Sequence, residues 1–224
     1  MMQSLSVGLQ KLLENSVQTI NLVGHGGEKF TPEMGDYGIK DYEKDVLEKL
    51  PEGEIVIVGH SMGSLCGFNL AQRYPSKVRG VVLIDPTMCG GLADIRVAKA
   101  LLSKPGRYIL PVLSNGLFVP ERDDAKLMLY NGQESSHLDS IARQPASGRA
   151  IREMLLGRLS GQTERPCALV VAGESRLSPT RQKIAWAKQV HAVSVATLAE
   201  SHCGILENSI LPDIVSGMVQ RVSV

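Results

Sequence analysis

Residues 58–67 read VGHSMGSLCG, and this stretch decides the fold that the sequence predicts. It places Ser61 between Gly59 and Gly63 in the pattern G-x-S-x-G, after an apolar run and before a helix-forming segment. A serine in such a strand-to-helix turn has a strained backbone and presents its hydroxyl at the amino end of the helix. We expect both glycines to be required, because a Cβ at either position would collide with the neighbouring strand or helix. Ser61 is therefore the candidate nucleophile.

Strand-like and helix-like segments alternate along most of the chain. Continuous apolar runs, typical of parallel strands covered on both faces, predict strands at residues 20–24, 54–59, 80–85, 168–173 and 191–198. Apolar residues at helical spacing, with Pro or Gly at the ends, predict helices at residues 39–50, 62–74, 179–190 and 213–222. This alternation predicts an α/β fold in which a mostly parallel sheet of about five strands has helices on both faces.

Residues 88–160 interrupt the alternation. They combine mixed apolar and charged helical patterns with several Gly and Pro breaks, and they contain no clear strand. We interpret them as a helical lid inserted between two strands, above the strand ends. Residues 1–87 and 161–224 would then form the core domain.

The composition narrows the class of partner. The 224 residues are 43% apolar and carry a formal net charge of +1 without a long run of like charges, which argues against nucleic acid and anionic membranes. No apolar stretch of about twenty residues could span a bilayer, and the first residues do not read as a signal peptide. The 4 cysteines lack disulfide or zinc-ligand spacing. We therefore expect no metal site and a cytoplasmic location.

A serine hydroxyl needs a general base, and the chain has 5 histidines. His202 follows the last predicted strand, so it falls on the same edge of a parallel sheet as Ser61. His60 adjoins the serine in sequence and would point away from it. The remaining three occupy a glycine turn, the insertion and the start of a strand: His25, His137 and His191. His202 is therefore the candidate base.

Taken in order, these segments resemble the α/β-hydrolase superfamily, in particular its serine esterases, from about residue 19 to the end of the chain. The resemblance rests on GHSMG, on the helix and strand RYPSKVRGVVLIDP, on ALVVAGE, on SHCGILEN and on NLVGHG followed by two Asp-Tyr pairs. It implies a serine hydrolase that cleaves a small carboxylic ester or thioester through an acyl-enzyme, with no cofactor. Ser61 would be the nucleophile and His202 the base.

The acid of the triad departs from the family pattern. The family carries it three residues after the glycine that ends the fourth of these strands, and that position here is Arg176, which cannot accept a hydrogen bond from a histidine. Asp85 ends the strand from which haloalkane-dehalogenase-like members supply their acid, and Glu174 directly follows Gly173. We expect Asp85 to be the acid, with Glu174 as the alternative.

The amino-terminal part also departs from the pattern. The backbone N–H of Met62 would be one oxyanion donor, but the loop that supplies the second donor usually lies further upstream than His25. Either the first family strands are absent, or residues 20–24 are the oxyanion strand and Gly26 or Gly27 is the second donor. A third alternative is a chain whose true start lies upstream. An absent strand would leave a sheet edge that favours a homodimer.

These departures leave a second hypothesis open. A hydrolase scaffold with Arg176 in place of the acid and without its front strands would suit a binding protein whose catalysis is weakened or lost. The presence of both Ser61 and His202 favours the enzyme. Labelling of Ser61 by an active-site probe separates the two hypotheses.

Overall fold

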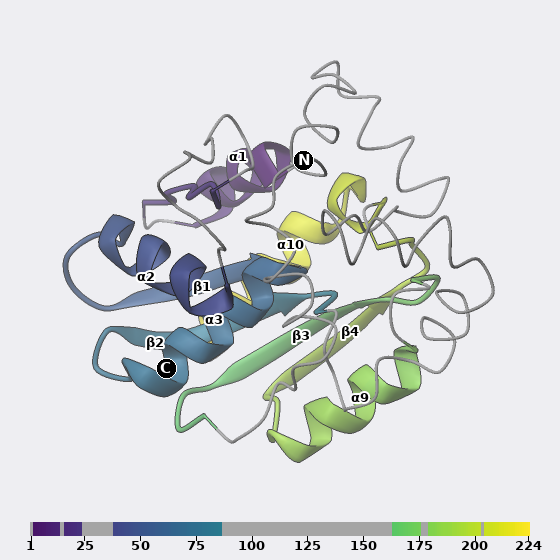
Figure 1. Cartoon of the computed structure of the whole chain (residues 1–224). Helices are drawn as coiled ribbons and strands as arrows, with labels where there is room; N and C mark the ends of the chain where they lie inside the picture. The colour runs from purple at the N-terminus through teal and green to yellow at the C-terminus, as the bar shows by residue number, and fades with distance from the viewer. Residues whose placement is uncertain (1, 14–15, 24–37, 87–162, 176–178, 203) are drawn as a thin grey trace, which may run out of the picture.

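A computed structural model of the chain describes residues 2–13, 16–23, 38–86, 163–175, 179–202 and 204–224 (Figure 1). The described strands form one parallel sheet in the order β1 (Ile55–His60), β2 (Val78–Ile84), β3 (Cys167–Ala172) and β4 (Ser194–Leu198). The described helices are α1 (Met2–Leu12), α2 (Ile39–Lys49), α3 (Met62–Arg73), α9 (Thr180–Gln189), the 3-10 helix η2 (Gly204–Glu207) and α10 (Leu211–Val222). The predicted α/β fold with a parallel sheet is confirmed.

Of the connections between strands, the one from β1 to β2 lies entirely within the described residues. Helix α3 joins β1 to β2 and carries the chain back so that the two strands run parallel. Parallel strands require such a crossover, whereas antiparallel strands can be joined by a short turn. All strands therefore end at the same edge of the sheet, and the residues that follow β1, β2, β3 and β4 are brought together there.

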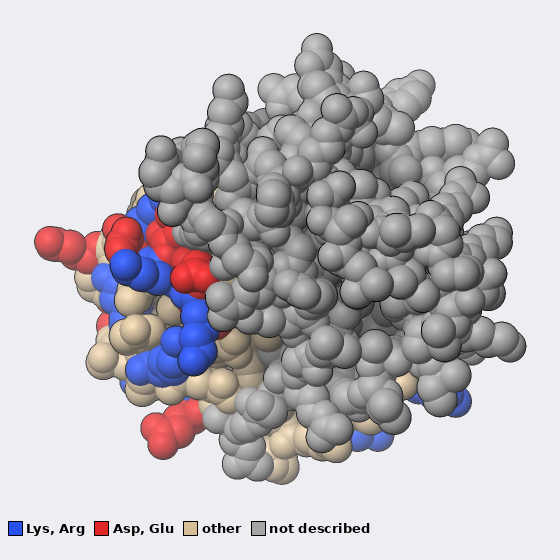
Figure 2. All heavy atoms as spheres, viewed as in Figure 1, with Lys and Arg blue, Asp and Glu red and all other residues tan. Residues whose placement is uncertain are grey.

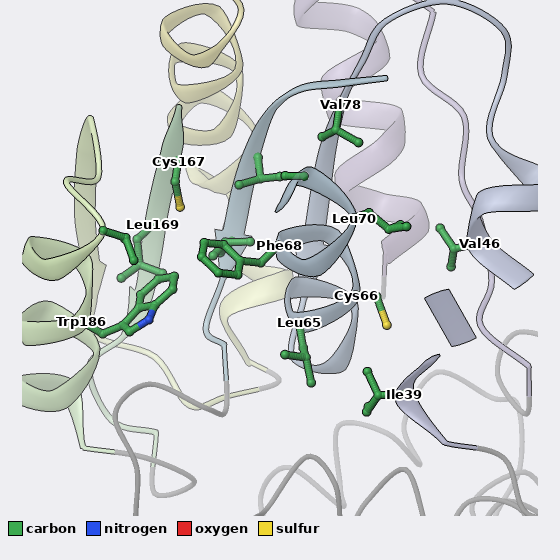
Figure 3. Close-up of a cluster of buried hydrophobic side chains, with 14 of the residues drawn as sticks. Ile39, Val46, Leu65, Cys66, Phe68, Leu70, Val78, Cys167, Leu169 and Trp186 are labelled. Atoms are coloured by element: carbon green, nitrogen blue, oxygen red, sulfur yellow. The ribbon is translucent and has the colours of Figure 1, made fainter. Parts of the chain in front are cut away.

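The core lies on both faces of the sheet, as the continuous apolar runs predicted. Alternate residues of a strand point to opposite faces, so Val81 and Leu83 of β2 pack against α2, α3 and α9, whereas Val82 and Ile84 pack against α1, α10 and η2 (Figure 1). On the first face, the rings of Phe68 and Trp186 meet edge-on, with centroids 5.1 Å apart (Figure 3). This contact joins α3 to α9, which both lie on that face of the sheet.

The strand predicted at residues 20–24 is not formed in the described part of the chain. Residues 16–22 are irregular and Val23 lies in a turn, although Val23 is buried and Ile20 and Leu22 pack against the same core cluster. The apolar run therefore covers the core without joining the ladder, since the same β-branched and aliphatic residues suit either role. Within the described residues, β1 is an edge strand.

Helix α1 was not predicted. It packs against α10 and buries Leu5 and Leu9 on the second face of the sheet. Gly8 permits this close approach, because a Cβ at that position would lie 2.8 Å from ring carbons of Pro212. The apolar spacing of residues 5 and 9 was the available signal.

Several predictions fall outside the described residues. These are the lid at residues 88–160, the domain division that depends on it, and the positions of Gly26, Gly27 and Arg176. No helix in the described ranges is long and apolar enough to cross a membrane. Where described residues form the surface in Figure 2, basic and acidic side chains are intermixed.

Candidate active site

Ser61 lies in the turn between β1 and α3, and its backbone is strained. Its φ is 54° and its ψ is −117°, a conformation that non-glycine residues rarely adopt. The Ser61 N–H donates to the carbonyl of Ile84 over 3.1 Å, and the buried Ser64 hydroxyl donates to the carbonyl of Gly59 over 2.6 Å. These bonds tie the end of β1, the start of α3 and the end of β2 into one unit, which holds Ser61 in its turn.

The two glycines of the motif differ in what they permit. A Cβ on Gly59 would lie 2.3 Å from the carbonyl oxygen of Gly63 and 2.6 Å from the backbone nitrogen of Ser64. A Cβ on Gly63 would meet no described atom within 4 Å. The steric requirement is therefore confirmed at Gly59, whereas the described structure shows no collision at Gly63.

Asp85 and His202 meet at the carboxyl edge of the sheet. His202 Nδ1 lies 2.6 Å from Asp85 Oδ2, and both side chains are buried. Asp85 has a φ of 42°, and its N–H donates to the carbonyl of Val170 over 2.8 Å, which continues the pairing of β2 with β3. A carboxylate only accepts, so Nδ1 carries the proton and Nε2 of the neutral ring keeps its lone pair. That nitrogen can act as a base.

The other oxygen of Asp85 also has donors. Oδ1 accepts the N–H of Ala172 over 2.9 Å and an ion-paired hydrogen bond from Lys183 Nζ. Burial alone raises the pKa of Asp85, but the hydrogen bond from His202 and the charge of Lys183 outweigh it and hold that pKa below its usual value. Asp85 is therefore ionised at neutral pH.

Our reading of the sequence missed Lys183. It lies at the amino-terminal end of the buried face of α9, where Trp186, Ala187 and Val190 follow at helical spacing. Lysine at a core position of an amphipathic helix is the signal that could have revealed a buried ionic partner, since lysine is almost never fully buried unless it is paired.

His60 supports the loop that carries His202. Its Nε2 lies 2.8 Å from the backbone oxygen of His202, and the two rings have centroids 4.6 Å apart. Desolvation of the ring and the neighbouring His202 lower the pKa of His60 from 6.5 to about 3. His60 is therefore neutral at neutral pH, and Nε2–H donates to the His202 carbonyl.

This lowered pKa predicts a dependence of stability on pH. The unfolded chain protonates His60 below pH 6.5 but the folded chain does so only near pH 3, so the free energy of unfolding falls as the pH drops between these values. We expect His60→Gln to flatten this slope by up to about 1.4 kcal/mol per pH unit. Urea unfolding of both proteins between about pH 7.5 and about pH 5 measures it. Identical slopes would contradict the prediction.

The remaining candidates either have described positions or lie outside the described residues, as Gly26, Gly27 and Arg176 do. Glu174 is exposed, and its N–H donates to the carbonyl of Glu200 over 3.0 Å, which ties the loops after β3 and β4 together. Met62 begins α3, where the first N–H groups have no partner within the helix. His191 is exposed and precedes β4, at the opposite edge of the sheet. Among the described residues, no three His, Cys, Asp or Glu side chains are grouped as metal ligands.

Comparison with known proteins gives one family. A family model described as the alpha/beta hydrolase fold matches residues 7–118. The monoglyceride lipase of Rattus norvegicus is 28% identical over 130 residues, which are 54% of this chain and 43% of the lipase. The pimeloyl-acyl carrier protein methyl ester esterase of Aromatoleum aromaticum is 38% identical over 73 residues, 33% of this chain and 27% of the esterase. The matched segments thus span less than half the length of these curated relatives.

Solved structures show the same fold. A thermophilic esterase from Thermogutta terrifontis superposes with a TM-score of 0.61 at 18% identity, over 99% of this chain and 86% of the esterase. At this level of identity the likeness concerns the arrangement of strands and helices. It agrees with the parallel sheet described above.

Proposed function

We propose that this chain, which belongs to the alpha/beta hydrolase fold family, hydrolyses a carboxylic ester or thioester. The observation that carries the proposal is the buried contact between His202 Nδ1 and Asp85 Oδ2, made at the sheet edge where Ser61 occupies its strained turn. The lipase and the esterase among its relatives support the same reaction class.

The proposed reaction uses these residues in two steps. Ser61 Oγ attacks the carbonyl carbon while His202 Nε2 takes its proton, and the imidazolium then protonates the departing alcohol or thiol. Water, deprotonated by His202, hydrolyses the acyl-enzyme and regenerates Ser61. The ionised Asp85 keeps the proton on Nδ1 and stabilises the imidazolium. The N–H of Met62 would stabilise the oxyanion, and Gly26 or Gly27 is proposed as the second donor.

The relatives suggest which small molecules to test first. Monoacylglycerols and methyl esters of acyl chains correspond to the activities named for the rat lipase and the bacterial esterase. We propose that the insertion at residues 88–160 selects among acyl groups. A cytoplasmic location and a homodimer formed through the edge of the sheet remain proposals.

A fluorophosphonate probe tests the nucleophile. We expect the wild-type protein to be labelled at one serine and Ser61→Ala to abolish the labelling, because only a hydroxyl activated by a base reacts with the probe at an appreciable rate. Ser209→Ala is the matched control, since Ser209 is exposed and lies in the turn before α10. Mass spectrometry of the labelled peptide identifies the site.

The same experiment decides between the enzyme and the scaffold. A protein that folds but takes up no probe, or that takes it up equally after Ser61→Ala, would contradict the hydrolase. That outcome would favour a binding protein built on this fold, the alternative that Arg176 suggests.

A further inference from the structure

We propose that Lys183 is a positioning residue: its ammonium group fixes Asp85 in the orientation that meets His202 and limits how strongly Asp85 stabilises a protonated His202. The inference rests on the proposed function, because it concerns the residues of the same site. It assigns a role to a side chain that lies outside the Ser–His–Asp set.

The geometry places the two side-chain partners of Asp85 on different oxygens of its carboxylate. Lys183 Nζ binds Oδ1 whereas His202 Nδ1 binds Oδ2, and the N–H of Ala172 shares Oδ1 with the lysine. Three donors from three different segments hold a carboxylate more firmly than a single imidazole could, since each fixes the plane of the group from another direction. The Asp85 side chain therefore has little freedom to turn away from His202.

Burial makes the charge of Lys183 effective. The side chains of Lys183 and Asp85 are both 0% exposed, so water screens their interaction very little. His202 contacts Oδ2 while the ammonium binds Oδ1, so the positive charge of Lys183 offsets part of the negative field that reaches His202. That field is therefore weaker than the field of an unpaired carboxylate.

The other titratable groups around His202 do not replace this effect. His60, which packs against the His202 ring from β1, is neutral. Glu200, in the same loop as His202, accepts a hydrogen bond from Asn208 over 2.9 Å. Among the described residues, the ion pairs at this cluster are those of Asp85 with His202 and with Lys183. Through Asp85, the charge of Lys183 therefore limits the stabilisation that a positive charge on His202 would receive.

Lys183→Met tests the inference, because methionine is an unbranched side chain only one atom shorter than lysine and carries no charge. We expect the acid side of the pH profile of kcat/KM to move upward by about one pH unit, since the unpaired carboxylate then favours the imidazolium. Lys183→Arg, which keeps the charge, should leave the profile near that of the wild type. Lys188→Met, an exposed lysine on the same helix, is the matched control and should change nothing.

A second readout does not depend on catalysis. The imidazole of His202 is titrated by NMR in a Ser61→Ala background with and without Lys183→Met, and the midpoint should shift in the same direction as the kinetic profile. If the wild type hydrolyses nothing, the proposed function fails while this titration still decides the role of Lys183. An unchanged midpoint in the folded Lys183→Met protein would overturn the inference.

Lys183→Gln serves if Lys183→Met does not fold, because glutamine keeps a hydrogen-bond donor without the charge. The upward shift should then appear in Lys183→Gln and be absent in Lys183→Arg. Loss of folding in both neutral variants would also overturn the proposal, since it would leave Lys183 as a purely structural partner of Asp85.

Discussion

Replacing Asp85 with asparagine is expected to lower kcat for ester hydrolysis by about a thousandfold to ten-thousandfold. The reason lies in the donors that surround the carboxylate. Lys183 Nζ and the N–H of Ala172 both point at one oxygen. The amide of an asparagine must turn its only oxygen toward these two donors, so its NH₂ group faces His202 Nδ1. The imidazole then carries its proton on Nε2 and can no longer accept one from Ser61.

Glu174→Gln is the matched comparison and should leave kcat almost unchanged, because the Glu174 side chain is exposed. Hydrolysis of a short-chain ester is followed in a pH-stat, with circular dichroism to show that each variant is folded. The folding control matters because Asp85→Asn also leaves Lys183 as a buried charge without its counter-ion, which typically costs about 3–5 kcal/mol. A larger loss of kcat in Glu174→Gln than in Asp85→Asn would transfer the role of the acid.

The sequence predicted those parts of the fold where one physical requirement dominates. Strands β2 and β3 are covered on both faces, which requires continuous apolar runs, and residues 80–85 and 168–173 are predicted to be strands on that ground. Helix α3 follows from the glycine-flanked turn and from Pro75, which ends it. Asp85 was chosen over Glu174 because it ends a buried strand, and the structure brings Asp85 and not Glu174 into contact with His202.

The predictions from the sequence failed where one residue pattern is compatible with two different structures. The apolar run at residues 20–24 suits a strand, but in the described residues it packs on the core as irregular chain. Lys183 was overlooked because a single lysine in an amphipathic helix normally lies on the solvated face. Its burial depends on Asp85, which is far away in the sequence, so only the folded chain reveals the pair. The helical spacing indicates that Lys183 is buried and needs a partner, but local sequence does not say which residue that partner is.

The turn at Ser61 gives a second large effect, on stability. We expect Gly59→Ala to lower the free energy of unfolding by about 3 kcal/mol or more, at the upper end of what overpacking costs. The added Cβ would lie 2.3 Å and 2.4 Å from the backbone oxygen and carbon of Gly63. Backbone cannot rotate away as a side chain can, so the first turn of α3 must shift as a unit and carry Ser61 with it.

Gly63→Ala is the control for that change, since it alters the same motif by the same methyl group. A Cβ there meets no described atom within 4 Å, and Gly63 lies within α3, where alanine is favoured over glycine by about 1 kcal/mol. Urea unfolding should therefore show Gly63→Ala to be at least as stable as the wild type while Gly59→Ala is strongly destabilised. Equal destabilisation by both substitutions would mean that the turn depends on the backbone freedom of glycine at each position, and the steric explanation of the motif would be wrong.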